Sequence, residues 1–448
     1  MSKAATRFVP SHRSRSKSEA FAIIPIVVFA YAIIVEPLLG FLSSPTNAIG
    51  LSGAAAVEAL MRPRIENKIF WPVITAITVY YVAKNLPRLK NLPPHIILLL
   101  IYLAYAGTSV LWAFNPGLTL TRFVLQSMIV TCIVLPIIMA DKNADVIPGI
   151  FGCFACAVIL NLPIVLSQTP IIYDTWKGPE IIGYPGYFSF KGELGECAAV
   201  AFLLSLHELF YRGRRRVIGL IVLVISVYLA IESKSKGSLG MAIISPTLAL
   251  AVLFIGRLIR TSPALTLLPI PLTYYVMSKV YGNILNRISW YALGNYDLSG
   301  RAYIWNFVQY EISKKPILGW GYQSFWLVGP NGPSVLEAPG WIKGMPSGHS
   351  GYLDTMLELG YVGWMLLVAF IFATLHAIGR VAERNLLRAW LLLTLALFVI
   401  LSNFLESIWM RGQGTLWVTF LVVVADAGRY WRRAPSVSRH PQRAVTRV

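Results

Sequence analysis

The sequence has few charged residues: Asp, Glu, Lys and Arg make up 13% of its 448 residues, whereas hydrophobic types make up 56%. A soluble protein of this length carries about twice that charge, so the composition excludes an ordinary water-soluble domain. Several stretches of about 20 residues contain almost no charge, which is the length that a membrane-spanning helix needs. The sequence therefore predicts an all-α polytopic membrane protein.

Cysteine is scarce, and so are the motifs that hold cofactors. The four cysteines (Cys132, Cys153, Cys156 and Cys197) all fall in apolar stretches. We interpret them as small core residues, with a metal or redox pair at Cys153 and Cys156 as the alternative. The sequence has no Gly-x-x-x-x-Gly-Lys-Ser/Thr loop for a nucleotide. It also has no His-Glu-x-x-His zinc helix and no Asp-x-Asp pair. We therefore expect neither a metal nor another cofactor.

Apolar segments are predicted to cross the membrane at twelve places. They are residues 21–43, 69–84, 95–114, 120–140, 146–167, 192–211, 217–232, 237–256, 262–279, 350–375, 386–402 and 412–427. Cytoplasmic loops concentrate Lys and Arg, and the basic runs at 212–216 and 380–388 place both chain ends inside. The net charge of +19, from 39 basic and 20 acidic residues, is therefore interpreted as a topological signal and not as nucleic-acid binding.

This topology divides the chain into two tails, two groups of spans and one large exterior loop. The parts are a basic cytoplasmic tail (1–20), nine spans (21–279), the loop (280–349), three spans (350–427) and a second basic tail (428–448). No cleavable signal peptide is expected before the first span. Apolar residues at helical spacing from Ile304 to Ile312 predict an amphipathic helix in the loop. The density of aromatic residues in the loop is typical of an element at the membrane surface.

Polar residues that lipid would not tolerate without a function gather on the predicted exterior face. They are Arg122, Lys191, Glu193, Glu196, Glu232, Lys234, Lys236, Arg301, His349, Asp354, Glu358, Glu406 and Arg411. Charges at membrane depth usually face a cavity or a partner, so several of these side chains are expected to converge on one basic pocket. An exterior site lacks ATP, and a transfer reaction there needs a donor that is activated by its own leaving group. A lipid-linked diphosphate fits, because cationic side chains can stabilise its departing charge without a metal.

Each candidate also has a structural interpretation. The alternatives are an interfacial hydrogen-bonded His349, an Arg301–Asp297 pair, Lys234 and Lys236 snorkelling at a helix end, a Glu406–Arg411 pair, and Arg122 as an interfacial anchor. His349 carries the sharpest chemical hypothesis, because imidazole is the side chain best suited to act as a base near neutral pH.

Short motifs follow one another from about Ser109 to Trp417. They read SVLWAFNPGLTLTR (109–122), GYFSFKGELG (186–195), SKSKGSLG (233–240), SGRAYIW (299–305), PILGWGYQSFW (316–326), GHSGYLDTMLELGYVG (348–363) and SNFLESIW (402–409). In this order, with a long exterior loop before the histidine, they resemble the O-antigen ligase and exopolysaccharide polymerase superfamily of bacterial envelopes. The sequence departs from that family's pattern at Phe190, Gly192 and Ser350, and Lys236 stands where many members have Arg.

The resemblance implies a GT-C-like enzyme of the bacterial inner membrane. It would transfer glycan from undecaprenyl diphosphate at the periplasmic face, with inversion and without a metal. His349 would be the base, and Arg301 and Lys236 would hold the diphosphate. The further substrate-binding candidates are Lys191, Lys234, Arg122, Glu406 and Tyr352, the last as a holder of the acceptor.

Competing functions remain open at this stage. The first is a polymerase that joins lipid-linked repeat units, and the second is a ligase that moves a finished polymer to a lipid core or a protein. The third is a transporter or flippase, which more often shows two corresponding halves with broken helices. The expected partners are the lipid bilayer, the carrier-linked glycan, and a chain-length regulator or other envelope polysaccharide assembly proteins, with no nucleic acid.

Overall fold

Helices make up most of the described chain. The structure is a computed structural model that describes residues 12–43, 64–85, 91–140, 144–175, 178–281 and 300–431. The long elements are α1 (His12–Ala30), η1 (Tyr31–Val35), α2 (Glu36–Ser43), α4 (Ile65–Ala83), α5 (Pro94–Thr108), α6 (Pro116–Met139), α7 (Ile147–Ser167), α8 (Lys191–Glu208), α9 (Arg214–Glu232), α10 (Lys236–Leu258), α11 (Pro263–Leu267), α12 (Pro269–Tyr281), α16 (Gly351–Ala382), α17 (Leu386–Ser402) and α18 (Thr415–Trp431). Each of the twelve segments predicted from the sequence falls on one to three of these elements.

Within the described ranges, six helical stretches are long and apolar enough to cross a membrane. They are Phe21–Ser43, Pro94–Leu111, Pro116–Met139, Ile147–Ser167, Lys236–Leu258 and Gly351–Ala382. The chain is thus an α-helical membrane protein, as the composition predicted. That the remaining six segments also cross the bilayer stays a prediction, and so do the four boundaries drawn between tails, spans and loop.

The helices begin where the sequence supplies suitable first residues. Proline stands at the first or second position of α5, α6, α7 and α11, where its missing N–H costs no hydrogen bond. The side chain of Asn115 caps α6 by accepting from the N–H of Leu118, and Asn385 caps α17 in the same way. The two capped helices therefore have defined starts next to the loops that carry polar residues.

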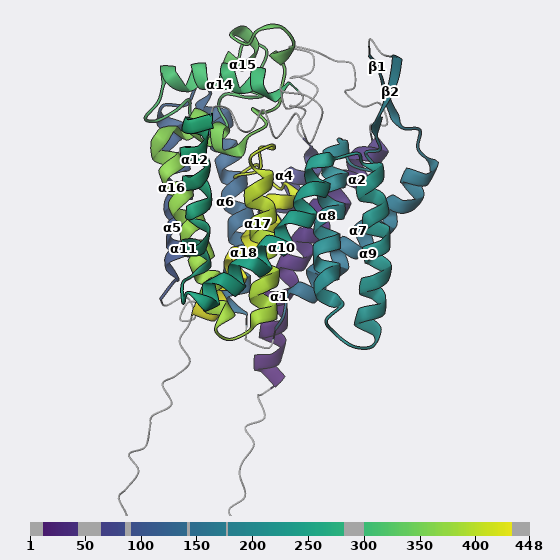
Figure 1. The fold of residues 1–448 in the computed structure, drawn as a ribbon. Coiled ribbons are helices and arrows are strands. Elements are labelled where there is room, and N and C mark those ends of the chain that lie inside the picture. The colour runs from purple at the N-terminus through teal and green to yellow at the C-terminus, as the bar shows by residue number, and fades with distance from the viewer. Residues whose placement is uncertain are drawn as a thin grey trace, which may run out of the picture.

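The helices run side by side in a bundle, with α17 and α18 in its middle (Figure 1). Most side chains of these two helices are buried, as expected for helices that are apolar on all sides. The first turn of α1 and the last turn of α18 lie at one end of the bundle. The elements η3 (Ser109–Leu111), α14 (Arg301–Lys314), α15 (Pro333–Leu336) and η4 (Gly340–Ile342) belong to the other end, where α14 and α15 form a cap.

The cap has a hydrophobic core of its own. Phe307, Trp320, Phe325 and Trp326 are each at most 8% exposed and pack together there. Trp320, Phe325 and Trp326 are among the loop aromatics that suggested an element at the membrane surface, and that position stays a prediction. The four rings hold α14 against the segment that follows it and against the start of α16. The expectation of a helix in the loop is confirmed by α14.

A two-stranded hairpin at the same end was not predicted. β1 (Ile171–Thr175) pairs antiparallel with β2 (Gly178–Gly183), and an irregularity in register separates Ile171 from Ile172. The hairpin projects beyond the ends of α7 and α8 (Figure 1). It therefore borders the same face of the bundle as the cap.

Candidate active site

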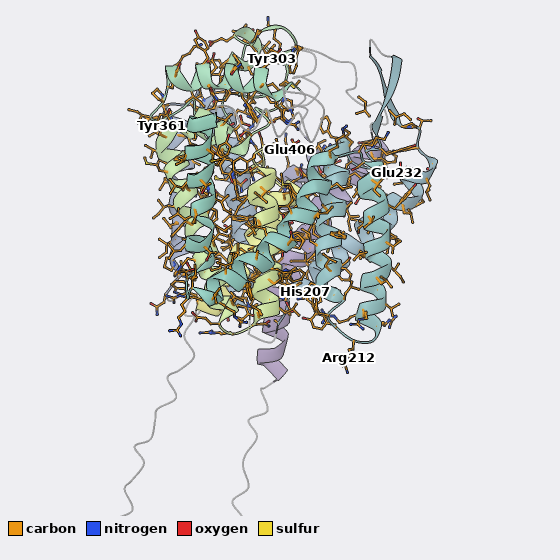
Figure 2. All side chains as sticks on the ribbon, viewed as in Figure 1. His207, Arg212, Glu232, Tyr303, Tyr361 and Glu406 are labelled. Carbon is orange, nitrogen blue, oxygen red and sulfur yellow. The ribbon has the colours of Figure 1, made fainter. Side chains whose placement is uncertain are left out.

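His349, Glu406 and Arg301 meet at the cap end of the bundle, although they are far apart in the sequence. The Nδ1 atom of His349 lies 3.2 Å from Oε2 of Glu406. The guanidinium of Arg301 lies 2.8 Å from the other oxygen, Oε1, and its Nε donates to the carbonyl of Leu405 at 3.0 Å. The three side chains are 28%, 42% and 23% exposed, respectively. They therefore form a paired group that solvent, and hence a substrate, can reach. Figure 2 shows Glu406 at the end of the bundle below the cap.

The carboxylate decides which imidazole nitrogen is available. An ionised carboxylate only accepts hydrogen bonds, so Nδ1 of His349 carries the proton that points to Glu406. In a neutral imidazole the other nitrogen, Nε2, then has a free lone pair. The arrangement can therefore take a proton from a group that approaches Nε2, while Glu406 stabilises the imidazolium that forms.

The electrostatics of Glu406 follow from these contacts. Burial alone would raise the pKa of its carboxyl, but the hydrogen bond and charge from His349, together with Arg301, lower that pKa below its ordinary value. The carboxylate thus stays ionised around neutral pH and keeps both of its partners.

The loop before α16 brings the histidine to this position. Gly351, the first residue of α16, donates its N–H to the carbonyls of Asn403 and Glu406, each at 2.9 Å. A Cβ at Gly351 would lie 2.0 Å from Oδ1 of Asn403, so only glycine permits this close approach. The start of α16 is therefore joined directly to the segment that carries Glu406.

Two of the predicted lysines hold the hairpin. Lys191 donates to the carbonyl of Ile182 at 2.9 Å, and Lys234 donates to the carbonyl of Ile181 at 3.4 Å. Lys234 also has a left-handed backbone, with φ of +50°. These contacts support the interpretation of Lys234 as a structural residue at a helix end, and they tie the last residues of β2 to α8 and to the start of α10.

Lys236 is the more available cation. It is exposed at the first position of α10, and its ammonium makes no hydrogen bond or ion pair with any residue in the described ranges. The adjacent residue, Gly237, faces Leu405: a Cβ there would lie 3.9 Å from Cδ1 of that leucine. Because Leu405 also accepts the hydrogen bond from Arg301, the start of α10 borders the paired group.

Arg122 and Tyr352 are occupied elsewhere. The guanidinium of Arg122 donates to the carbonyls of Gln323, Trp326 and Leu327. It therefore stabilises the loop of the cap that these three residues form. The hydroxyl of Tyr352 donates to the carbonyl of Ile400 at 2.9 Å. Neither side chain is directed to the paired group, and their contacts favour structural roles over the expected contact with substrate.

The structural alternative for Glu406 is wrong as well. Arg411 pairs with Asp354 at 3.0 Å and with Glu358 at 2.8 Å, whereas Glu406 pairs with Arg301 and His349. Sequence reasoning placed all these residues on one face, but it missed this division into two groups. The alternative partner proposed for Arg301, Asp297, lies outside the described residues. Among the residues that the structure does describe, no group of three or more His, Cys, Asp or Glu side chains is arranged to hold a metal ion.

Comparison with known proteins found relatives that work with bacterial polysaccharides. No family model matches the chain. A Rickettsia felis protein named a polysaccharide ligase is 29% identical over 126 residues, which cover 27% of this chain and 31% of the relative. A second such ligase, from Rickettsia conorii, is 27% identical over 126 residues, which cover 27% of this chain and 30% of that protein. The exopolysaccharide production protein ExoQ of Rhizobium meliloti is 24% identical over 285 residues, which cover 59% of this chain and 60% of ExoQ.

The matched region thus spans about a third of the length of the two Rickettsia relatives and 60% of ExoQ. These names agree with the resemblance carried by the motifs between Ser109 and Trp417. At this modest identity, the relatives support a similarity of this membrane protein to the O-antigen ligase/ExoQ-like family.

Proposed function

We propose that this chain polymerises oligosaccharide units that are carried on undecaprenyl diphosphate, at the periplasmic face of the inner membrane. The observation that carries the proposal is the His349–Glu406–Arg301 group, in which a carboxylate orients an imidazole beside a guanidinium. A base next to a cation is what a transfer from a diphosphate leaving group requires. The names of the relatives support the same substrate class.

The reaction is a substitution at the anomeric carbon of the donor sugar. A hydroxyl of the acceptor sugar attacks that carbon, and Nε2 of His349 takes the hydroxyl proton as the new carbon–oxygen bond forms. The bond from the carbon to the diphosphate breaks, and its electron pair leaves with the diphosphate. Attack from the face opposite the leaving group inverts the configuration.

Cationic side chains meet the charge that develops on the diphosphate. Arg301 donates to Glu406 and to the carbonyl of Leu405, and charge-assisted bonds from a guanidinium to a diphosphate strengthen as negative charge grows. Lys236 supplies a second positive charge from the start of α10. A lysine cannot form the two parallel bonds of an arginine, so we assign it electrostatic attraction and not orientation.

A ligase that transfers finished polymer is the second candidate, and the names of the two Rickettsia relatives favour it. The two functions share the donor and the base and differ in the acceptor. Purified protein in proteoliposomes separates them. A polymerase lengthens the glycan when both donor and acceptor are lipid-linked repeat units, whereas a ligase transfers only to a lipid-core or protein acceptor.

The decisive variant is His349→Gln, because glutamine keeps a polar side chain but cannot serve as the base. We expect turnover in the proteoliposomes to fall by about 10²-fold or more, the scale of general-base catalysis, and lipid-linked units to accumulate in cells. His376→Gln is the matched control: it changes a histidine within α16, the helix that follows His349, and this histidine lies beside Trp431. Near-normal polymer from His349→Gln would leave His349 a structural residue.

A further inference from the structure

Asp354 is a buried carboxylate on the first turn of α16, five residues after His349. It is 2% exposed. Its Oδ1 accepts from the indole Nε1 of Trp326 at 2.9 Å, and both of its oxygens lie 3.1 Å from the N–H of Gly348. An ionised carboxylate is tolerated in such a place only when it is paired and hydrogen-bonded. Asp354 therefore holds the peptide group between Ser347 and Gly348, next to the histidine.

The same carboxylate also holds the segment that carries Glu406. Ser407 donates its hydroxyl to Oδ2 of Asp354 at 2.6 Å, and Arg411 donates to that oxygen at 3.0 Å. Arg411 in turn pairs with Glu358 at 2.8 Å. One buried ion cluster thus fixes the residues that follow Glu406 relative to the first turns of α16.

The histidine needs this support because its backbone is unusual. His349 has φ of +49°, a left-handed conformation that is uncommon for residues other than glycine and that persists only where the surrounding structure fixes it. Both peptide groups of Gly348 are held, the one before it by Asp354 and the one after it by Trp305. Asp354 accepts from its N–H, and the indole of Trp305 donates to its carbonyl at 3.1 Å.

A rotation of either peptide group would turn the imidazole. The contact between His349 and Glu406 is 3.2 Å long, so a displacement of about 1 Å would break it, and misplacements of that size can cost about 10²-fold in rate. The two bonds to Gly348 do not touch the imidazole, but they determine where it points.

We propose that Asp354 and Trp305 are positioning residues for His349. Together they fix the peptide groups on both sides of Gly348 and with them the left-handed backbone of His349, which keeps Nδ1 on Glu406 and leaves Nε2 directed to the acceptor. The inference rests on the proposed function for the identity of the reaction, whereas the geometry of the turn stands apart from it. Neither side chain touches the reacting atoms in this role.

Two variants remove the two bonds separately. Asp354→Asn keeps the shape of the side chain but replaces one oxygen by a donor and removes the charge that faces Arg411. Trp305→Phe removes only the indole N–H, and because Trp305 is half-buried the fold should tolerate it. Trp320→Phe is the matched control: Trp320 donates its indole N–H to the carbonyl of Glu311 at 3.2 Å, in the core of the cap and away from the turn.

A double-mutant cycle tests whether the two residues act through the histidine. In the wild-type background, Asp354→Asn and Trp305→Phe should each lower kcat by about tenfold or more, with KM nearly unchanged. In a His349→Ala background each should change the residual rate by less than about twofold, because the group that they position is gone. Trp320→Phe should change neither. An equal tenfold loss in both backgrounds would mean that the residues act on folding alone and would overturn the proposal.

A spectroscopic measurement separates failure of the proposal from failure of the proposed function. The chain has six histidines, so the side-chain nitrogen signals of ¹⁵N-histidine-labelled protein can be assigned to His349 by comparison with His349→Ala. We expect the hydrogen-bonded Nδ1 signal of His349 to shift in Asp354→Asn and in Trp305→Phe, and to stay in place in Trp320→Phe. An unchanged signal in both positioning variants would refute the positioning of His349 by Asp354 and Trp305, whether or not the protein transfers glycan. A shifted signal without glycan transfer by the wild type would refute the proposed function and keep the positioning of the imidazole.

Discussion

Glu406 is the residue on which the orientation of the candidate site depends. Its two oxygens serve two different partners, His349 at 3.2 Å and Arg301 at 2.8 Å. A carboxylate shared in this way couples the histidine to the arginine, because a movement of either partner displaces the other. The paired group should therefore respond to changes in side-chain shape as well as to changes in charge.

Arg301 tests this dependence on shape. Its guanidinium donates to Glu406 through Nη2 and to the carbonyl of Leu405 through Nε. The ammonium of a lysine cannot reproduce the directions of both hydrogen bonds. We expect Arg301→Lys to retain part of the glycan-transfer rate and Arg301→Ala to retain almost none, measured as turnover in proteoliposomes. Arg257→Ala, which removes an exposed cation at the last turn of α10, should behave as wild type. Normal turnover by a well-folded Arg301→Ala protein would exclude a role at the diphosphate.

Glu406 itself predicts a pH dependence of stability. Its pKa is lowered in the folded protein. Its pairing therefore stabilises the fold fully above the pKa of the unfolded carboxyl, about 4.3. This contribution is lost as the pH falls through the folded pKa. Wild type should therefore have a higher Tm than Glu406→Gln at pH 7, and the difference should shrink below about pH 4. Thermal unfolding in detergent at both pH values measures it. Glu383→Gln removes an exposed carboxylate and should leave Tm unchanged at pH 7. A Glu406 difference of the same size at both pH values would show that charge pairing is not its cause.

At the level of elements, the apolar runs predicted the helices well and the connections poorly. Long uncharged segments such as 146–167 have one stable solution in lipid, because a helix satisfies every backbone hydrogen bond internally. The hairpin from Ile171 to Gly183 has no such signal. It is held by contacts with distant residues, such as the bonds from Lys191 and Lys234 to its second strand. Sequence periodicity cannot show which distant side chain will satisfy a loop carbonyl.

The bend in α16 is a second feature that depends on a distant contact. Gly360 has φ of +64° inside this helix, and a Cβ there would lie 2.0 Å from the carbonyl oxygen of Ile317. The cap thus meets α16 at a point where only glycine allows the approach. The bend lies two turns after the residues that hold His349, so it links the cap to the candidate site.

We expect Gly360→Ala to lower the free energy of unfolding by about 1–3 kcal/mol, the scale of backbone strain at a positive φ. Gly240→Ala is the matched control in α10, since a Cβ there meets no atom within 4 Å. A glycine to alanine change inside an ordinary helix should be neutral or stabilise it by roughly 0.5–1 kcal/mol. Equal unfolding midpoints for the two variants in detergent would contradict the strained bend.

At the scale of the whole molecule, the sequence predicted that the polar candidate residues lie at one end of the bundle, but not which of these side chains form ion pairs. His349, Arg301 and Glu406 were all placed on the exterior side by the positions of the spans, and the structure brings them together. Arg411 was expected to pair with Glu406, yet it neutralises Asp354 and Glu358 instead. Both pairings satisfy charge equally well. The choice between them depends on how the loop before α18 folds against α16, which no local pattern encodes.

The arrangement of the whole chain makes a prediction about the two sides of the membrane. The start of α1 and the end of α18 lie at the end of the bundle opposite the cap (Figure 1). Figure 2 places His207 and Arg212 at that same end, and Tyr303 and Glu406 at the cap end. Arg212 begins the basic run Arg212–Arg216, and cytoplasmic segments concentrate such residues. The cap, with the candidate site beneath it, should therefore face the periplasm.

Reporter fusions measure this arrangement directly. Gly329 is a suitable insertion point in the cap, because its φ of +111° marks a turn and a Cβ there would meet no atom within 4 Å. Alkaline phosphatase, which is active only outside the cytoplasm, should be active when it is inserted after Gly329 and inactive when it is fused after Arg433. A fluorescent protein that folds only in the cytoplasm should give the opposite pattern, and the same pair of reporters placed after Arg212 should match the result at Arg433. If both reporters placed Gly329 and Arg433 on the same side, the number of crossings between them would be even. The site would then face the compartment of the basic tail, and a donor presented in the periplasm could not reach His349.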